Sequence, residues 1–591
     1  MLSLAWPLFA AAVGGGDPAP LPVLRHSDVV FMYEASADVY RAYGATVLAW
    51  GGTPTAEALA TAHGAGVAYF GSVGMVTEFG RVIDAYPGYE EAICLDVEGN
   101  RLRVPWLWDH QHKGVPAYWF CTNQPIFRDY MRRRVVETVR AGADGVHIDD
   151  HLGTAGNSWL GGCYCDQCLA GFREYLAVDA PPDDLAGAGI ADPAGLDYRA
   201  LVLGFIAQHP EAKEQLWRRP LAHHFATFQS RRAAAFMMEL RRLAADTAGR
   251  PLPMSANAGV PHIAHLSDYR ALDFLSCEVE QRASELKPYD GVAFAYRMAE
   301  ALGRPVAGTA SGWDWSVIND KRLSGLVRLW IAQAYALGHF FMAPHHQWCY
   351  TQEKGTHWYE GPTEEYAWLF RAVRDHASLF DGYETVADVG LLVAAGAYRE
   401  GKHEAEEAAA ALTRANIPYR VFLAGDDALP CTLSVDELRS VRTLVVSHRE
   451  ALSAVDRAEL DARAADGGVI DWQGAEALLA AIPRPIRVRG GNSVWAIPRA
   501  NPTDEAAPKV IHLVNRDYDA ASDTVTPLAD VSVEVDPALF GCEGFARAVL
   551  HPMAPPGEPR DLPLTMGGGA ATVGVPELGM WAIIELVPGG E

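Results

Sequence analysis

The chain has 591 residues, of which 49% are hydrophobic and 21% are charged, with a formal net charge of -25. This length exceeds what one hydrophobic core usually holds and predicts two to four domains. The acidic balance argues against nucleic acid or an anionic membrane as a partner, because both would repel the chain, and nine cysteines spread over so many residues exclude a disulfide scaffold.

The first 13 residues, MLSLAWPLFAAAV, form an apolar run that is followed by a segment rich in Gly and Pro. The run is too short to span a bilayer and resembles the apolar centre of a signal peptide, placed within residues 1–20. No Lys or Arg precedes it, so export to the periplasm or the outside is only weakly favoured over the cytoplasm.

Residues 25–380 alternate short β-rich runs with helical segments, which is typical of a parallel α/β fold. Helices with apolar residues three and four positions apart are expected at 129–141, 223–245 and 324–337. Residues 176–215, rich in Pro, Asp and Gly, are expected to form an excursion. The eight expected strands, the number that closes a (β/α)8 TIM barrel, lie at 29–34, 46–50, 67–72, 145–150, 253–257, 274–278, 305–309 and 338–343.

Two smaller domains are expected after the barrel. Strands near 389, 419, 443 and 468, with helices at 404–415 and 454–466, predict a flavodoxin-like α/β domain over residues 385–485. From 488 to 591 the runs become short and alternating, separated by Gly, Pro and Asp. They predict a C-terminal antiparallel β-sandwich.

The fourth expected strand leads directly into a cluster of ionisable side chains. Because strand side chains alternate between faces, His147 and Asp149 would face the barrel axis while the apolar residues between them face the helices. Asp150 and His151 follow at the carboxyl end, where TIM-barrel enzymes keep their active sites. A polar loop after an ordinary strand is the alternative, but two acids and two histidines in five residues favour a site.

A second acidic pair follows the same alternation on the sixth expected strand. Glu278 and Glu280 would face inward, although a surface acidic loop is the alternative. Glycosidic cleavage usually needs two carboxyl groups flanking one bond. We therefore expect a retaining glycoside hydrolase of oligo- or polysaccharides with Asp149 as nucleophile and Glu278 as acid/base, and with Asp150 and Glu280 in reserve for these two roles.

Polar or aromatic residues also stand at the other expected strand ends. Sugars present apolar ring faces edged by hydroxyls, so aromatic rings beside His, Asn and Asp suit them. A tryptophan taken alone is more often a core residue, so the shared position of these residues supports the assignment. The expected substrate-binding residues are Glu34, His147, His151, Asn257, Trp313, Asp314, His345, His346 and Trp348.

Three cysteines, Cys163, Cys165 and Cys168, are spaced so that their thiolates can converge on one zinc ion. A tetrahedral structural site needs four ligands, and Cys121 is the candidate for the fourth. Free thiols are the alternative. No organic cofactor is expected.

Three segments together resemble the β-galactosidases of glycoside hydrolase family 42, namely CTNQPIFRDY at 121–130, VHIDDHLG at 146–153 and CYCDQCLAGFREY at 163–175. The resemblance in domain order covers nearly the whole chain. It implies a catalytic barrel, a flavodoxin-like trimerisation domain, a small β domain and a homotrimer. It also implies that the four cysteines hold a structural zinc.

The catalytic residues differ from that family. The family has Asp-Asn-Glu where this chain has Asp149, Asp150 and His151, and residues 308–312 lack the acid that would match its nucleophile. An Asp on the fourth strand and a Glu on the sixth are instead similar to dextranase-like and α-galactosidase-like barrels, in which the fourth-strand Asp is the nucleophile.

Two other functions remain open. Because His151 stands where the related enzymes keep Glu, the chain is alternatively a carbohydrate-binding protein without catalysis on a glycosidase scaffold. The cluster from His147 to His151 is alternatively the ligand set of a metal-dependent hydrolase, although neighbouring strand residues point in different directions.

Overall fold

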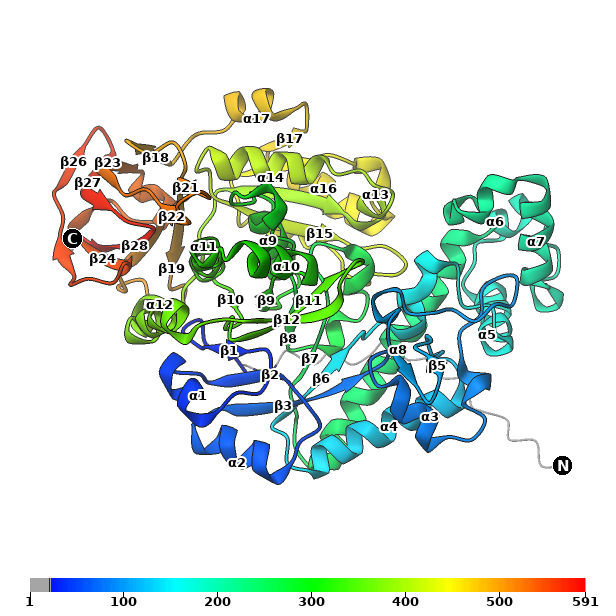
Figure 1. Cartoon of the computed structure of the whole chain (residues 1–591). Helices are drawn as coiled ribbons and strands as arrows, with labels where there is room; N and C mark the ends of the chain where they lie inside the picture. The colour runs from blue at the N-terminus through cyan, green and yellow to red at the C-terminus, as the bar shows by residue number, and fades with distance from the viewer. Residues whose placement is uncertain (1–20, 22, 590–591) are drawn as a thin grey trace.

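The computed structural model describes residues 21 and 23–589, so the apolar run at residues 1–13 lies outside the described residues. Eight strands form one parallel sheet in the order β1-β2-β3-β6-β7-β8-β9-β10. A parallel bridge between Phe31 and Ala343 links the first strand to the segment after the last one, so the sheet closes on itself. The predicted TIM barrel is therefore confirmed (Figure 1).

The barrel strands are shorter than the sequence predicted at several ends, because alternation does not reveal where ladder hydrogen bonding stops. β8 has the predicted bounds, whereas the first and eighth predicted strands are reduced to two residues each. The strands are β1 (Val30–Phe31), β2 (Val47–Gly51), β3 (Ala68–Gly74), β6 (Gly145–Asp149), β7 (Met254–Ala256), β8 (Phe274–Glu278), β9 (Val306–Thr309) and β10 (Phe340–Phe341).

Helices cover the outside of the barrel. Ser36 and Thr55 start the first two helices by accepting backbone N–H hydrogen bonds, as N-cap side chains do. The three predicted helices are present, with ends that differ from the prediction by at most four residues. The helices are α1 (Ala37–Tyr43), α2 (Ala56–Gly64), α4 (Pro125–Arg140), α8 (Ala222–Ala248), α9 (Val292–Ala301) and α11 (Ser324–Ala336).

The excursion after β6 is helical and packs around a small core of its own. It contains α5 (Asp166–Val178), α6 (Pro182–Gly187) and α7 (Tyr198–Gln208), which project to the right of the barrel in Figure 1. Phe172 packs against Tyr198 and Phe225, with ring centroids 4.7 and 5.0 Å away. The loop-forming composition of this segment therefore conceals two helices, of which α7 packs on the aromatic core through Tyr198.

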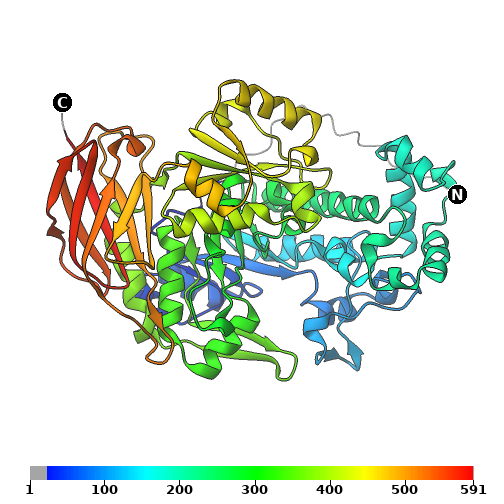
Figure 2. The same cartoon turned by 90° about the horizontal axis from the view of Figure 1, so that it is seen from above.

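A second parallel sheet has the strand order β15-β14-β16-β17, and Figure 2 shows helices packed beside it. Leu392, Leu444 and Leu460 are among the buried residues of its core. The strands are β14 (Val389–Ala394), β15 (Tyr419–Ala424), β16 (Thr443–Val446) and β17 (Val469–Asp471), and the flanking helices include α14 (Glu404–Arg414) and α16 (Ala454–Ala465).

The C-terminal part is antiparallel, as predicted. A six-stranded sheet and a four-stranded sheet share one core, which includes Ile511, Val533 and Ile584. The longest strands are β19 (Val494–Ala500), β20 (Lys509–Asn515), β23 (Leu528–Val535), β24 (Phe545–Ala554), β27 (Ala570–Leu578) and β28 (Trp581–Pro588).

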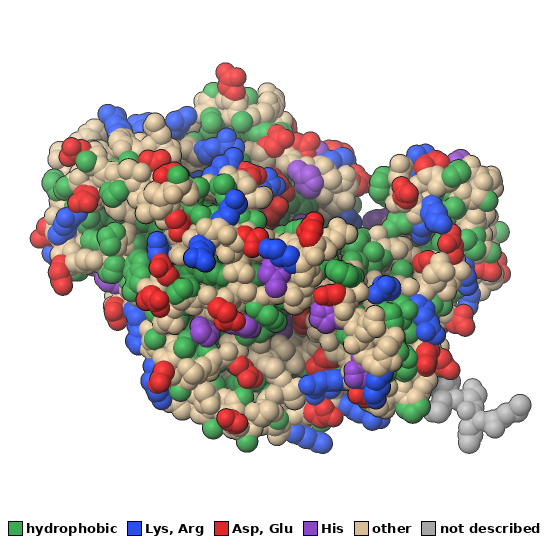
Figure 3. All heavy atoms as spheres, viewed as in Figure 1, with side chains coloured by type: hydrophobic (Ala, Val, Ile, Leu, Met, Phe, Trp, Pro, Cys, Tyr) green, Lys and Arg blue, Asp and Glu red, His purple; other side chains and the backbone are tan. Residues whose placement is uncertain are grey.

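The parallel barrel brings the carboxyl ends of its strands to one rim. The hairpin of β11 (His346–Thr351) and β12 (Gly355–Glu360), which was not predicted, follows β10 and extends from this rim together with α10 (Gly312–Lys321). In the described part of the chain, no helix combines the length and hydrophobicity needed to cross a bilayer. On the face shown in Figure 3, basic side chains are scattered among acidic ones.

Candidate active site

The two predicted catalytic carboxyls stand at the carboxyl ends of two barrel strands that flank β7. Asp149 is the last residue of β6 and Glu278 the last residue of β8, with β7 between them. Adjacent strands lie about 4.8 Å apart, so the two backbones are separated by roughly 10 Å, which side chains can span from both sides. Both residues line the same cavity.

Asp149 receives hydrogen bonds that favour its ionised form. The Asp150 backbone N–H donates to Oδ1 at 3.0 Å, and the Asn257 amide and the Thr77 hydroxyl donate longer bonds of 3.4 Å to the two carboxylate oxygens. Burial still raises the pKa of Asp149 above its ordinary value, against these three bonds. Asp149 is therefore a carboxylate that the site holds in a defined orientation.

Glu278 lies among negative charges, whereas Asp149 accepts hydrogen bonds. Burial, followed by the negative charges of Asp149 and Asp314, raises the pKa of Glu278 to about 8. The carboxyl of Glu278 is consequently protonated at neutral pH. A carboxyl that keeps its proton, beside a second carboxyl that accepts three hydrogen bonds, is an arrangement suited to general acid catalysis.

Asp150 has a backbone conformation that is uncommon outside glycine. Its φ is +52°, in the left-handed region, which costs an Asp on the order of 1 kcal/mol. Burial and the charges of Asp149 and Glu278 raise its pKa well above the ordinary value, and its Oδ2 is buried with no partner among the described residues. Backbone strain and an unpaired carboxyl thus coincide at the end of β6, a combination that is often found at functional sites.

Tyr33, which was not among the predicted site residues, lies near both carboxyls and beside two tryptophans. Burial, then Asp149 and Glu278, raise the pKa of its phenol, so it remains a hydrogen-bond donor. Its ring makes edge contacts with Trp50 and Trp358 at centroid distances of 6.2 and 5.5 Å. Tyr33 directly precedes Glu34 after β1, so the rule used for the other strand ends applied to it as well.

The cavity over the rim has a volume of about 1420 Å³. Small-molecule sites are commonly about 300–1,000 Å³, so this space admits several linked sugar units. Five tryptophans of the described chain are strongly exposed, and four of them line this cavity. These four are Trp108, Trp159, Trp313 and Trp358.

A second cavity of about 830 Å³ meets the first at Asp149. The two cavities share six lining residues, namely Tyr33, Trp50, Thr77, Phe79, Asp149 and Trp358. Open space therefore extends from Asp149 in two directions, and Asp149 does not lie at a closed end.

The structure distributes the predicted site residues over three places. Glu34 and His346 line the second cavity only. His147 and His345 are not among the residues that line either cavity, and His147 is buried inside the barrel, where it stacks on Trp50 at a centroid distance of 4.5 Å. The remaining predicted residues line the larger cavity: Asp149, Asp150, His151, Asn257, Glu278, Glu280, Trp313, Asp314 and Trp348.

Two of the predicted residues at the larger cavity are engaged by neighbours. Both carboxylate oxygens of Asp314 accept backbone N–H hydrogen bonds, from Gln281 at 3.0 Å and Ala283 at 2.7 Å, so Asp314 fixes the loop after β8. Glu280 forms an ion pair of 3.3 Å with Arg282 and is more than half exposed. Neither residue has the buried, unpaired carboxyl seen at Glu278.

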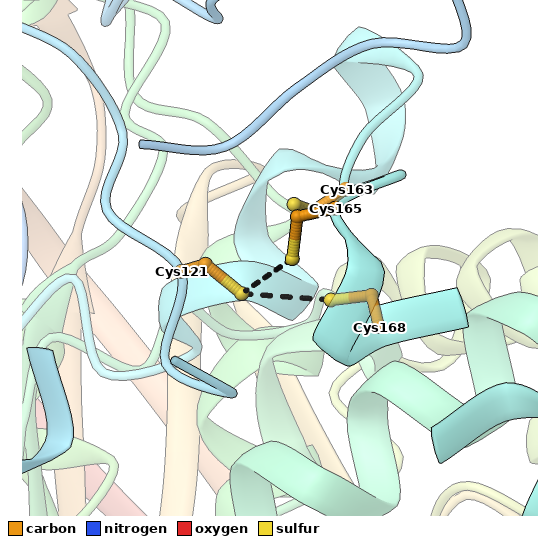
Figure 4. A group of neighbouring side chains, drawn as sticks. All are labelled: Cys121, Cys163, Cys165 and Cys168. Carbon is orange, nitrogen blue, oxygen red and sulfur yellow. Dashed lines mark hydrogen bonds between the residues drawn. The ribbon is translucent and has the colours of Figure 1, made fainter. Parts of the chain in front are cut away.

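The four predicted metal-ligating cysteines converge. The sulfur atoms of Cys121, Cys163, Cys165 and Cys168 are all buried and lie within 4.8 Å of one another (Figure 4). Sulfurs 3.5 and 3.7 Å apart are close to the roughly 3.8 Å separation that tetrahedral Zn–S bonds of 2.3 Å produce. The Asn123 amide also donates to the Cys168 sulfur at 3.2 Å. The cluster can hold a metal.

Comparisons with known proteins find relatives and solved structures that carry the names of glycosidases. No family model matches the chain. A curated protein named α-agarase from Alteromonas agarilytica is 24% identical over 547 residues, which are 87% of this chain and 36% of that protein. A second α-agarase, from Thalassotalea agarivorans, is 24% identical over 96% of this chain and 40% of its own length. The chain thus spans well under half the length of these relatives.

Two solved structures share the fold over almost the whole chain. An α-L-fucosidase isoenzyme from Paenibacillus thiaminolyticus has a TM-score of 0.59 and 13% identity, and covers 96% of this chain and all of its own. A β-galactosidase from Rahnella sp. R3 has a TM-score of 0.55 and 12% identity, with 94% and 100% coverage. At these identities the likeness establishes the fold alone.

Proposed function

We propose that the chain is a glycosidase that cleaves O-glycosidic bonds of a polysaccharide by a retaining mechanism. The observation that carries this proposal is the pair of carboxyls on β6 and β8 that line one cavity, with Glu278 protonated at neutral pH and Asp149 accepting three hydrogen bonds. Asp149, ionised and held by three hydrogen bonds, is the nucleophile. Glu278, which holds its proton at neutral pH, is the acid/base.

The reaction follows from these two states. A carboxylate oxygen of Asp149 attacks the anomeric carbon while the glycosidic C–O bond breaks and Glu278 gives its proton to the leaving oxygen. Glu278, now ionised, then takes a proton from a water molecule that attacks the same carbon and releases Asp149. The phenol of Tyr33 is placed to donate a hydrogen bond beside both carboxyls during these steps.

The charge of the cavity favours a neutral polysaccharide. Among the described residues that line the larger cavity there are five carboxyl side chains and one guanidinium, that of Arg282. Arg282 is already paired with Glu280. A sulfated or uronic acid chain would be repelled here, whereas exposed tryptophans suit the apolar faces of neutral sugars.

The two cavities that meet at Asp149 favour cleavage inside a chain. A polysaccharide can extend in both directions from the reacting bond, and a pocket closed behind the nucleophile would favour chain ends instead. The names of the curated relatives make agar the first substrate to test and an α-linkage the first anomer.

The test is turnover by the full chain of agarose and other neutral polysaccharides, compared with the Glu278→Gln variant. We expect new reducing ends with the wild type only, a fall in viscosity before much sugar is released, and a first product that keeps the anomer of the substrate by NMR. Binding without turnover would favour the non-catalytic alternative. A first product of inverted anomer would remove Asp149 as nucleophile.

We also propose that the four cysteines hold one structural zinc. Buried thiols at tetrahedral spacing, with an amide donor at Cys168, fit this ion. Metal analysis should give one zinc per chain, and Cys121→Ser should lose it. Cys542, which lies outside the cluster, supplies the control as Cys542→Ser. Zinc retained in full by Cys121→Ser would contradict the assignment.

A further inference from the structure

His151 is held by a carboxylate from the next loop of the barrel rim. Its Nδ1 lies 2.7 Å from Oδ2 of Asp268, which belongs to the segment between β7 and β8. Both side chains are almost fully buried, with 1% and 0% of their side-chain surface exposed. The pair therefore joins the loops that follow two adjacent strands.

The pairing determines which nitrogen of His151 carries the proton. A carboxylate can only accept, so Nδ1 is the nitrogen that donates to Asp268, and in the singly protonated ring Nε2 then presents a lone pair. In the described structure Nε2 is buried and has no hydrogen-bond partner. His151 is among the residues that line the larger cavity, two residues after Asp149, so this unpaired nitrogen belongs to the wall of the space around the nucleophile.

A neutral acceptor is suited to this position. Asp149, Asp150 and Glu278 already bring three carboxyls to the rim, and their mutual repulsion contributes to their raised pKa values. A further anion would add to that repulsion, whereas an imidazole accepts a hydrogen bond without charge. The neighbouring His265 ring is uncharged at neutral pH, because burial and the nearby His151 and His262 lower its pKa to about 3.

Resting on the proposed function, we infer that Asp268 and His151 form an orienting pair in which Nε2 of His151 accepts a hydrogen bond from a hydroxyl of the sugar bound at Asp149. His151 is then a substrate-positioning residue that touches the sugar. Asp268 acts through His151 and is a positioning residue. The contact aligns the anomeric carbon with the nucleophile, so its loss affects the chemical step more than binding.

The experiment is a double-mutant cycle with His151→Ala, Asp268→Asn and the combined variant. We expect each single change to lower kcat/KM about 30- to 100-fold, mostly in kcat, with oligosaccharide binding weakened less than tenfold. The combined variant should be no worse than His151→Ala, because Asp268 has no route to the substrate except through His151. His151→Gln, which can present an amide oxygen near the position of Nε2, should recover part of the loss.

The control is a partly buried histidine–carboxylate pair in the C-terminal sandwich, far from the rim. His551 Nε2 lies 2.7 Å from Glu585 in the C-terminal sandwich. His551→Gln should lower the melting temperature about as much as His151→Gln does, but should leave kcat/KM unchanged. If the losses of kcat/KM in the two single variants add up in the combined variant, or if His151→Ala is fully active, the orienting role of the pair is wrong. The glycosidase proposal would still stand.

Failure of the glycosidase proposal gives a different result. If the wild type turns over no glycoside, the pair is judged by oligosaccharide binding, measured through tryptophan fluorescence. Weaker binding by His151→Ala and Asp268→Asn with no additivity would support the pair. Equal binding by all variants, or no binding by the wild type, would overturn it.

Discussion

Two glutamates of the barrel, Glu278 and Glu300, show how surroundings decide the role of a carboxyl. Glu278 ends β8 at the carboxyl rim and faces other carboxyls, with its pKa raised to about 8. Glu300 lies near the end of α9, at the amino ends of the strands, where Arg297 Nη1 is 2.7 Å from its Oε2 and Thr385 donates at 2.8 Å.

Burial raises the pKa of both glutamates, but only at Glu300 do neighbouring charges offset this effect. At Glu300 the effect of burial is outweighed by Arg297, His339 and Arg499, which hold its pKa well below the ordinary value. A buried carboxyl paired with cations stabilises the fold. Because Arg499 belongs to β19, Glu300 links the barrel to the C-terminal strands. A carboxyl without such partners is left as a proton donor.

The largest expected effect is loss of the nucleophile. Asp149→Asn keeps the size of the side chain but removes the charge that attacks the anomeric carbon, so kcat should fall about 10⁴-fold or more. The melting temperature should change little, which circular dichroism can check. Activity within tenfold of the wild type would remove Asp149 from the mechanism.

The acid/base should matter somewhat less. Glu278→Gln should lower kcat about 10²- to 10⁴-fold on natural linkages. The loss should be much smaller on aryl glycosides, whose leaving groups depart without a proton. An equal loss on both kinds of substrate would assign Glu278 another role.

The same substitution at the two glutamates should have opposite effects on stability. Glu300→Gln leaves Arg297 and Arg499 without their anion and should cost about 3–5 kcal/mol. The folded state disfavours the ionised form of Glu278, because the pKa rises from about 4.5 in the unfolded chain to about 8 in the folded one. Wild-type Glu278 therefore lowers the free energy of unfolding as pH rises above 4.5, and this loss is complete above about pH 8. Glu278→Gln should therefore gain stability over the wild type as pH rises. Denaturant unfolding at pH 4.5 and pH 9 measures both; a loss of stability in both variants would contradict the comparison.

The pH dependence of kcat/KM should reveal both active carboxyls. Activity requires Asp149 ionised, and its raised pKa places the acidic limb above pH 3.8. Activity also requires Glu278 protonated, so it should fall tenfold per unit above about pH 8. The residual activity of Glu278→Gln should lack this alkaline limb. An alkaline limb that persists in the variant would belong to another group.

The smallest effect is expected at the aromatic wall of the cavity. Trp313 is 53% exposed and lines the cavity, so Trp313→Ala should raise KM severalfold through loss of about 1 kcal/mol of stacking. Trp217 is 76% exposed but does not line it, and Trp217→Ala is the control with unchanged KM. Equal changes in both variants would point to a general surface effect.

Much of the barrel and the main carboxyl pair could be predicted from the sequence, because both depend on local periodicity. Alternation along β6 and β8 turns Asp149 and Glu278 inward, and parallel strands bring such ends to one rim. The same local reasoning placed His147 at the axis, but too deep in the barrel to line the cavity. Depth along the axis depends on how adjacent strands are staggered, which periodicity does not encode.

The contacts between segments that are distant in the sequence were decided only by the tertiary structure. Asp268 is 117 positions from His151, and Arg499 meets Glu300 from another sheet, so no spacing rule connects either pair. Trp108 and Trp159 reach the cavity from loops whose course depends on packing outside the barrel. The sequence by itself determined which strand ends carry acids. The tertiary structure determined which of those acids lack a cation, and a carboxyl's proton affinity depends on that long-range arrangement of charge and burial.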